Sequence, residues 1–201
     1  MGYRLIIFDL GGVVVECETD RVIHQVSYLA GRPLDEVHQA VYLDELLLPF
    51  ELGRISAHAY YQGLKDRLNI PWTYEQFVRS WNDMIREKPE ITALLPKLSR
   101  QCRLIVLSNT NELHLNHIRA SYPAMAAFEE WIASCNVGLR KPDPEIYHLA
   151  LRRCGVAAQK AIYIDDRPEL SEAGRALGLA SIRFENKAQF ERELRALGLE
   201  L

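Results

Sequence analysis

The amino-acid sequence predicts an α/β fold in which a doubly wound parallel sheet carries an all-helical insertion. Short, continuously apolar runs rich in branched residues alternate with segments of helical periodicity. This alternation is typical of a parallel sheet with helices on both faces. The long stretch between the first two apolar runs contains helical patterns only, which predicts the insertion.

Three runs are expected to form buried strands, and each ends in polar residues: Arg4–Asp9, Arg103–Ser108 and Ala161–Asp165. Trp131–Ser134 and Ala180–Phe184 are weaker strand candidates. Helices are expected between the strands, because these segments combine helical periodicity with an initial Pro or Asp-Pro, or with a Gly after the last turn. They are Pro89–Leu98, Asp143–Arg152 and Leu170–Leu177.

Residues 17–86 are expected to contain no strand, but several amphipathic helices such as Ser56–Leu68 and Thr73–Met84. We therefore expect a Rossmann-like core domain formed by residues 1–16 and 87–201, with residues 17–86 as a helical cap domain. An insertion after the first strand lies at the sheet's C-terminal edge, where open α/β sheets bind ligands. A lid over a site is the favoured interpretation, and a purely stabilising subdomain is the alternative.

The composition limits the class of partner. Hydrophobic residues make up 48% and charged residues 25% of the 201 residues, and the formal net charge is −3. These values argue against a broad nucleic-acid-binding surface and favour a small-molecule partner. The four cysteines form no C-x-x-C pair, so neither zinc nor a redox dithiol is expected. The first apolar run is short and interrupted, so we expect no signal peptide, no membrane association and a cytoplasmic location.

Polar residues that follow the predicted strands are the candidate functional residues. Asp9 ends the first strand, and Gly11 and Gly12 after it permit a tight turn and close approach of a ligand. Ser108 and Asn109 end the second strand, where a hydroxyl and an amide can bind an anion. Taken alone, each feature could equally cap a turn or a helix.

Two further clusters strengthen this prediction. Asp165 and Asp166 end the third strand, and adjacent carboxylates repel each other unless a cation compensates them. Together with Asp9 they suit Mg²⁺, although neutralisation by Arg167 is an alternative. Lys141 lies in a loop before a helix and could balance a carboxylate and a phosphoryl group, or simply be solvated. Because the ends of parallel strands converge, we expect all four clusters at one crevice.

These four clusters resemble the motifs of the haloacid dehalogenase superfamily, and the resemblance spans nearly the whole chain. The similar segments are Phe8–Val13, Leu107–Asn109, Arg140–Pro144 and Ile164–Arg167. The helical insertion resembles the first type of cap (C1) in that family. Glu51–Ser56 and the run after Leu107 are similar to a bacterial branch of small phosphatases that includes an α-D-glucose-1-phosphate phosphatase.

The resemblance implies a Mg²⁺-dependent phosphatase that acts on a small phosphorylated metabolite, with a sugar phosphate as the favoured substrate. Asp9 would be the nucleophile and form an aspartyl-phosphate. Ser108, Asn109 and Lys141 would bind the phosphoryl group, with Ser108 and Lys141 also catalytic. Asp9, the Gly11 carbonyl and Asp166 would bind the metal, and Asp165 would support the site from beside it. A monomer or weak homodimer is expected.

One position departs from the family pattern. Most phosphatases of this family carry a second Asp, the general acid/base, where this chain has Gly11. Such a group contributes roughly 10²–10⁴ in rate, which leaves three outcomes: catalysis is slow, the leaving group needs little help, or another residue supplies the proton. Glu51, His24 and His58 of the insertion are conceivable donors, although solvation on a helix face is the favoured role for each. Two competing functions stay open: a 2-haloacid dehalogenase, disfavoured by the Asp165–Asp166 pair, and a catalytically weak phosphate-ligand-binding or regulatory protein.

Overall fold

A parallel five-stranded sheet forms the centre of the molecule in the computed structural model, which describes residues 2–43 and 45–201. The strand order is β5-β4-β1-β6-β7, and every neighbouring pair is parallel. The strand bounds are β1 Leu5–Phe8, β4 Arg103–Ser108, β5 Glu130–Ala133, β6 Ala161–Asp165 and β7 Ala180–Arg183. All five predicted strands are therefore confirmed, and so is the predicted fold class.

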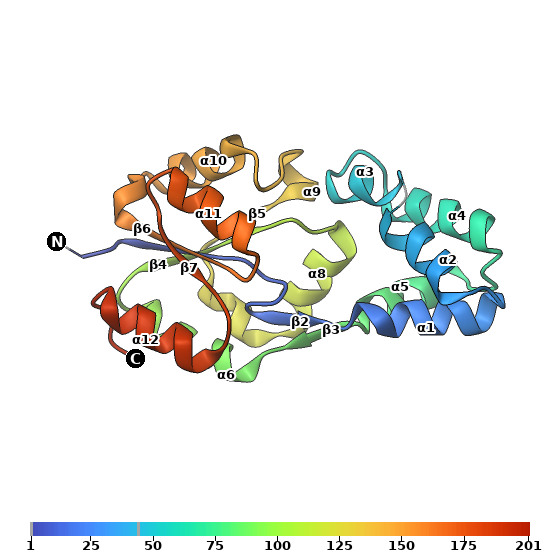
Figure 1. Cartoon of the computed structure of the whole chain (residues 1–201), viewed down its shortest axis with the longest axis horizontal. Coiled ribbons are helices and arrows are strands. Elements are labelled where there is room, and N and C mark those ends of the chain that lie inside the picture. The colour runs from blue at the N-terminus through green and yellow to red at the C-terminus, as the bar shows by residue number, and fades with distance from the viewer. Residues whose placement is uncertain (1, 44) are drawn as a thin grey trace.

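Helices cover both faces of the sheet (Figure 1). Because side chains alternate along a strand, Leu5 and Ile7 point to one face and Ile6 and Phe8 to the other, and all four are fully buried. The first face packs against α10, and the second packs against α6, α7, α8 and α12. The helix bounds are α6 Pro89–Thr92, α7 Leu95–Leu98, α8 Glu112–Ser121, α9 Ser134–Val137, α10 Pro144–Cys154, α11 Pro168–Ala176 and α12 Lys187–Ala196. Single turns are η2 Pro123–Ala127 and η3 Ala158–Lys160.

The insertion is helical and lies beyond the C-terminal ends of the sheet strands (Figure 1). Its elements are α1 Thr19–Ala30, α2 Leu34–His38, η1 Gln39–Leu43, α3 Leu47–Glu51, α4 Ala57–Leu68 and α5 Tyr74–Asn82. The sequence signals for α4 and α5 act as expected: the Ser56 hydroxyl caps α4, and Thr73 forms a capping box with Gln76 at the start of α5. The two predicted helices of the insertion are thus confirmed.

Two predictions of secondary structure need correction. The insertion was expected to contain no strand, yet both of its ends enter an antiparallel ribbon, β2 (Val15–Cys17) with β3 (Ile85–Glu87). Strands of three residues are too short to show a periodicity of their own, and cross-strand pairing creates them. The single helix predicted over Pro89–Leu98 forms as two short helices, α6 and α7, with Ala93 and Leu94 between them.

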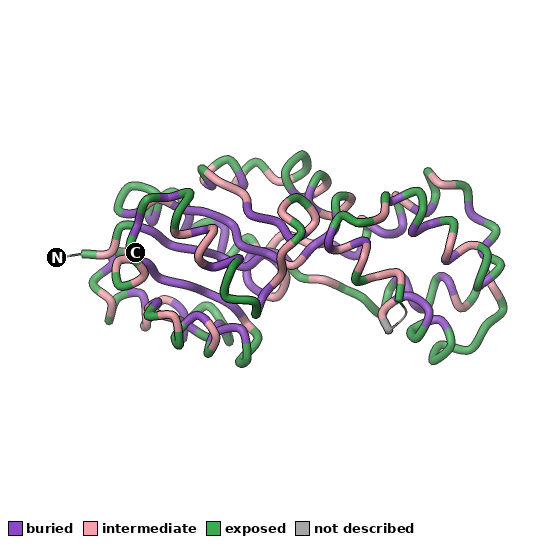
Figure 2. The backbone as a smooth tube through the Cα atoms, turned by 90° about the horizontal axis from the view of Figure 1, so that it is seen from above, coloured by how far each residue is buried: buried purple, intermediate pink, exposed green. Residues whose placement is uncertain are grey.

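The insertion and the sheet share one continuous apolar core, visible in Figure 2 as buried chain running from the strands into the insertion. At the centre of the contact, the Trp81 ring of α5 stacks on His114 of α8, with ring centroids 5.4 Å apart. Further polar links fix the contact: the Glu112 carboxylate accepts from Ala57 N at 2.7 Å, and the Ser134 hydroxyl donates to Glu51 O at 2.6 Å. The insertion is therefore held by specific contacts over the strand ends.

Among the residues that the structure describes, no helix combines the length and the apolar character needed to cross a membrane. The cytoplasmic location stays a prediction.

The contact between His114 and Trp81 requires a neutral imidazole. Nε2–H donates to Trp81 O at 3.0 Å, and Nδ1 lies 3.2 Å from the Asn111 amide nitrogen, which can only donate. A proton on Nδ1 would therefore place two donors face to face. Burial lowers the pKa of His114 from 6.5 to about 4, so the neutral form persists in mildly acidic solution.

We predict that His114 makes the fold sensitive to acid. Its pKa is depressed on folding, so its contribution to stability is complete above pH 6.5 and is lost as the pH falls towards about 4. At pH 5 the loss amounts to about 2 kcal/mol. His114→Gln keeps a donor but cannot titrate, so between pH 7.5 and pH 5 its free energy of unfolding in urea should fall less than that of the wild type, by about that amount. Equal losses in both proteins would contradict the assignment.

Candidate active site

Three strand ends bring the predicted site residues together. The register pairs Phe8 of β1 with Val106 of β4 and with Ile164 of β6, so the residues that follow are neighbours at one edge of the sheet. Asp9 follows β1, Ser108 ends β4 and Asp165 ends β6, and all three are buried. This confirms the expectation that polar strand ends converge on one crevice.

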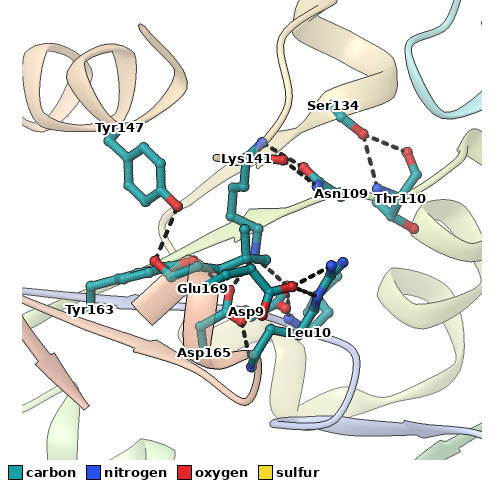
Figure 3. Close-up of polar contacts among 12 residues, drawn as sticks. Asp9, Leu10, Asn109, Thr110, Ser134, Lys141, Tyr147, Tyr163, Asp165 and Glu169 are labelled. Carbon is teal, nitrogen blue, oxygen red and sulfur yellow. Dashed lines mark hydrogen bonds and ion pairs between the residues drawn. The ribbon is translucent and has the colours of Figure 1, made fainter. Parts of the chain in front are cut away.

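The ammonium group of Lys141 lies between two carboxylates (Figure 3). Its Nζ is 3.0 Å from Asp9 Oδ1 and 2.6 Å from Asp165 Oδ2, and the side chain is only 1% exposed. Burial alone would lower the pKa of Lys141, but the two carboxylates outweigh it and the pKa is raised. Lys141 is therefore a permanent cation at the centre of the site.

One cation does not balance the carboxylates around it. Burial raises the pKa of Asp9 to about 6, with Lys141 opposing and Asp165 adding to the effect. Burial, and then repulsion from Asp165, also raises the pKa of Asp166. Ligand oxygens of Asp9, Asp165 and Asp166 can all lie within 4.8 Å of one another. The cluster thus carries an excess of negative charge that a further cation would relieve.

The three carboxylates differ in what already occupies them. Asp165 is fully engaged: Oδ2 accepts from Lys141 and from the Tyr163 hydroxyl, and Oδ1 accepts from Arg167 N at 3.0 Å. Asp9 Oδ1 accepts from Leu10 N at 2.7 Å. The Asp166 carboxylate accepts from its own backbone, and no other residue that the structure describes donates a hydrogen bond to it. The donor set therefore fits a hard divalent cation such as Mg²⁺ at Asp9 and Asp166, with Asp165 holding Lys141.

Gly12 allows Asp166 to approach the turn after β1. Its φ is +73°, and a Cβ atom at this position would lie 2.1 Å from Asp166 Oδ2. A side chain would therefore both strain the backbone and displace the carboxylate. The sequence indicated close approach to a ligand at these glycines, but in this structure it is a carboxylate of the site itself that Gly12 accommodates.

Asn109 secures the loop that carries Lys141. Its side-chain amide donates to Lys141 O at 2.9 Å and accepts from Lys141 N at 2.8 Å (Figure 3). This pair of bonds fixes the backbone of Lys141, which sequence reasoning did not foresee, since it assigned Asn109 to the phosphoryl group alone. Asn109 and Ser108 also line the adjoining cavity, where a ligand can reach them.

A cavity of about 160 Å³ lies between these strand ends and the insertion. Gly11, Ser108 and Asn109 line it from the sheet, and Glu51 and Trp81 line it from the insertion. The position of the missing carboxylate, Gly11, therefore faces a cavity that both parts of the chain line. His24 and His58, two candidates for the missing proton donor, are exposed and do not line this cavity.

Sequence reasoning gave no role to three residues that shape the site. The Ser134 hydroxyl, fully buried, accepts from Thr110 N at 2.9 Å, and the Tyr163 hydroxyl donates to Asp165. Lys88 Nζ donates to Gly12 O at 2.7 Å and pairs with Glu16 at 2.9 Å, which ties the ribbon to the turn after β1. Ser134 ends the predicted strand Trp131–Ser134 and so carried the same signal as Ser108, whereas Lys88 carried none.

The comparisons with known proteins agree with this geometry. The family profile of haloacid dehalogenase-like hydrolases matches residues 3–178, so the chain belongs to that family of enzymes. The D-ribitol-5-phosphate phosphatase of Bacteroides thetaiotaomicron is 26% identical to it, over 94% of this chain and 95% of that protein. A sesquiterpene phosphatase of Aspergillus oryzae is also 26% identical, over 97% of this chain and 96% of that protein. The resemblance found in the four motifs is thereby confirmed.

A solved structure supports the fold. A haloacid dehalogenase family enzyme of Bacteroides thetaiotaomicron, in complex with magnesium and inorganic phosphate, superposes with a TM-score of 0.83 and 22% identity, over 92% of this chain and 95% of that chain. At this level of identity the likeness shows the fold alone.

We predict that the two glycines after Asp9 differ in their tolerance of a side chain. Gly12→Ala should lower the free energy of unfolding by at least about 1 kcal/mol, because alanine is strained at positive φ and its Cβ collides with Asp166. The matched control is Gly11→Ala, whose Cβ would meet only Cys17 Sγ at 3.4 Å and should change stability by no more than about 0.5 kcal/mol. Urea unfolding measures both, and equal stabilities would contradict the proposed contact.

Proposed function

We propose that the protein is a Mg²⁺-dependent phosphatase that hydrolyses a small phosphorylated metabolite through an aspartyl-phosphate at Asp9. The observation that carries this proposal is the cluster in which Asp9 meets Lys141 and two further carboxylates, next to the strand-end residues Gly11 and Ser108 that line a cavity. Family membership and the phosphatase relatives support it.

Each residue of the site would have its own role in the reaction. The Asp9 carboxylate attacks phosphorus and takes the phosphoryl group from the leaving alcohol; water then releases phosphate and restores the carboxylate. Lys141, held by Asn109 and Asp165, stabilises the negative charge of the phosphoryl group, and Ser108 donates to it. Asp9, Asp166 and the Gly11 carbonyl would hold Mg²⁺, which when bound offsets the repulsion between anionic nucleophile and anionic substrate.

In this proposal residues 1–16 and 87–201 form the catalytic core, and residues 17–86 form a cap that encloses the substrate. The cavity between them is small, about 160 Å³, and both Glu51 and Trp81 line it. A carboxylate and an aromatic ring in one cavity suit a compact polyhydroxylated alcohol. A sugar or sugar-alcohol phosphate is therefore our choice of substrate, in keeping with the ribitol-5-phosphate relative.

A dehalogenase is not favoured. Asp9 converges with two further carboxylates, and the single ammonium group of Lys141 pairs only with Asp9 and Asp165. This arrangement is destabilising unless a divalent cation balances the remaining negative charge. The reacting carbon–halogen bond of a haloacid carries no formal negative charge that such a cation would neutralise.

We predict that turnover depends on Asp9 and on metal. Asp9→Asn should lower kcat on a panel of sugar phosphates and p-nitrophenyl phosphate by more than about 10³-fold, because the amide is a poor nucleophile. EDTA should abolish wild-type activity, and added Mg²⁺ should restore it. The matched control is Asp35→Asn, the same change on the exposed start of α2, which should leave activity at the wild-type level.

Phosphate release measures each arm of this experiment. Full activity in Asp9→Asn, or wild-type activity that is indifferent to EDTA, would contradict the proposal. A folded, Mg²⁺-loaded protein that binds inorganic phosphate but hydrolyses no substrate would instead favour a phosphate-ligand-binding protein on this fold.

A further inference from the structure

The chain has no side chain where a general acid is expected, yet the departure of an alkoxide from a phosphate ester requires a proton. Gly11 offers only its backbone to the cavity beside Asp9. A proton donor must therefore come from another group that lines the same cavity. Four described side chains there can titrate: Cys17, Tyr42, Glu51 and His114.

Three of these four groups are unsuited to proton transfer near neutral pH. Burial raises the pKa of the Cys17 thiol to about 12. Burial likewise raises the pKa of Tyr42, whose hydroxyl lies against Met84 Sδ. His114 uses both ring nitrogens: its only N–H proton is donated to Trp81 O, and the other nitrogen accepts from Asn111. Only Glu51 is left.

Glu51 is the last residue of α3 and lines the cavity together with Ser108 and Asn109. Its carbonyl accepts from the Ser134 hydroxyl at 2.6 Å, and that hydroxyl in turn accepts from Thr110 N, two residues after Ser108. Its carboxylate lies 3.7 Å from Arg140, the residue before Lys141. Contacts from two directions thus hold Glu51 in the wall of the cavity that Gly11, Ser108 and Asn109 line from the sheet.

The surroundings of Glu51 keep its proton within reach. Arg140 and Arg167 favour the carboxylate, but burial opposes them and prevails, so the pKa of Glu51 is raised. Tyr42, Tyr60 and Cys135 are the other titratable groups whose environment includes Glu51, and burial raises the pKa of each of them, so they stay neutral near pH 7. A carboxyl group with a raised pKa is suited to alternate between acid and base.

We infer that Glu51 is the proton donor to the leaving oxygen, in place of the carboxylate that is absent at Gly11. As Asp9 binds phosphorus and the P–O bond breaks, the Glu51 proton moves to the bridging oxygen, which leaves as an alcohol. The resulting Glu51 carboxylate then takes a proton from the water that attacks the aspartyl-phosphate. Inorganic phosphate leaves, and Asp9 and protonated Glu51 are regenerated. This inference rests on the proposed function and names a residue that acts on the substrate.

The test compares leaving groups that differ in their need for a proton. The p-nitrophenolate ion leaves unaided, whereas a sugar alkoxide does not. In Glu51→Gln, kcat/KM for the sugar phosphate that the wild type hydrolyses fastest should fall by roughly 10²–10⁴-fold, and that for p-nitrophenyl phosphate by less than about 10-fold. The quantity kcat/KM reports the step in which the leaving group departs.

Glu112→Gln is the matched control. Glu112 also joins the core to the insertion, through Ala57 N at 2.7 Å, but it does not line the cavity. The amide oxygen of glutamine keeps this acceptor, so both substrates should be hydrolysed as in the wild type. If kcat/KM falls selectively for the sugar phosphate in Glu51→Gln but not in Glu112→Gln, the fall cannot come from a loosened insertion.

Three results would overturn the inference. One is an equal loss on both substrates in Glu51→Gln, which would make Glu51 a binding or positioning residue. Another is no loss on either substrate. The third is a wild-type enzyme that hydrolyses p-nitrophenyl phosphate but no sugar phosphate, as expected of a site without a general acid. In each case Asp9-dependent turnover of p-nitrophenyl phosphate would leave the proposed phosphatase function standing.

Discussion

The site depends on one buried ammonium group shared between two carboxylates. Lys141 lies 3.0 Å from Asp9 and 2.6 Å from Asp165, and almost none of its side chain reaches solvent. A buried ion pair is costly unless further hydrogen bonds complete it, and here Asn109 holds the backbone of Lys141 while Tyr163 and Arg167 N hold Asp165. Because Asp9 and Asp165 share one ammonium group, the Asp9 carboxylate keeps negative charge that a second cation can neutralise.

The fold supplies the constraint that makes this arrangement possible. Parallel strands deliver Asp9, Ser108 and Asp165 to one edge, and fully buried apolar residues behind them leave little freedom to move. The insertion closes the remaining side through Trp81, Glu51 and the ribbon that Lys88 ties to Gly12. Substrate would therefore meet preorganised charges in a small cavity.

The sequence was most informative where one strong pattern determines the structure. Continuous apolar runs such as Ala161–Asp165 become strands because the sheet buries both of their faces. The polar residues at the carboxyl ends of these parallel strands are then neighbours at one edge of the sheet. Structural features that leave no periodic pattern in the sequence were not predicted. The β2–β3 ribbon forms through pairing between distant segments, and Lys88 acts through a backbone carbonyl that no sequence pattern indicates. Glu51 was one candidate among three until the cavity separated it from His24 and His58.

The central claim is that the charges around Asp9 are arranged to make its carboxylate the nucleophile. The most direct measurement is peptide mass spectrometry after turnover with excess p-nitrophenyl phosphate and Mg²⁺ is stopped by acid. We predict a phosphoryl group on the peptide that contains Asp9, located at Asp9 by fragmentation. Phosphate release without any phosphorylated peptide, or a phosphoryl group on another residue, would contradict the account.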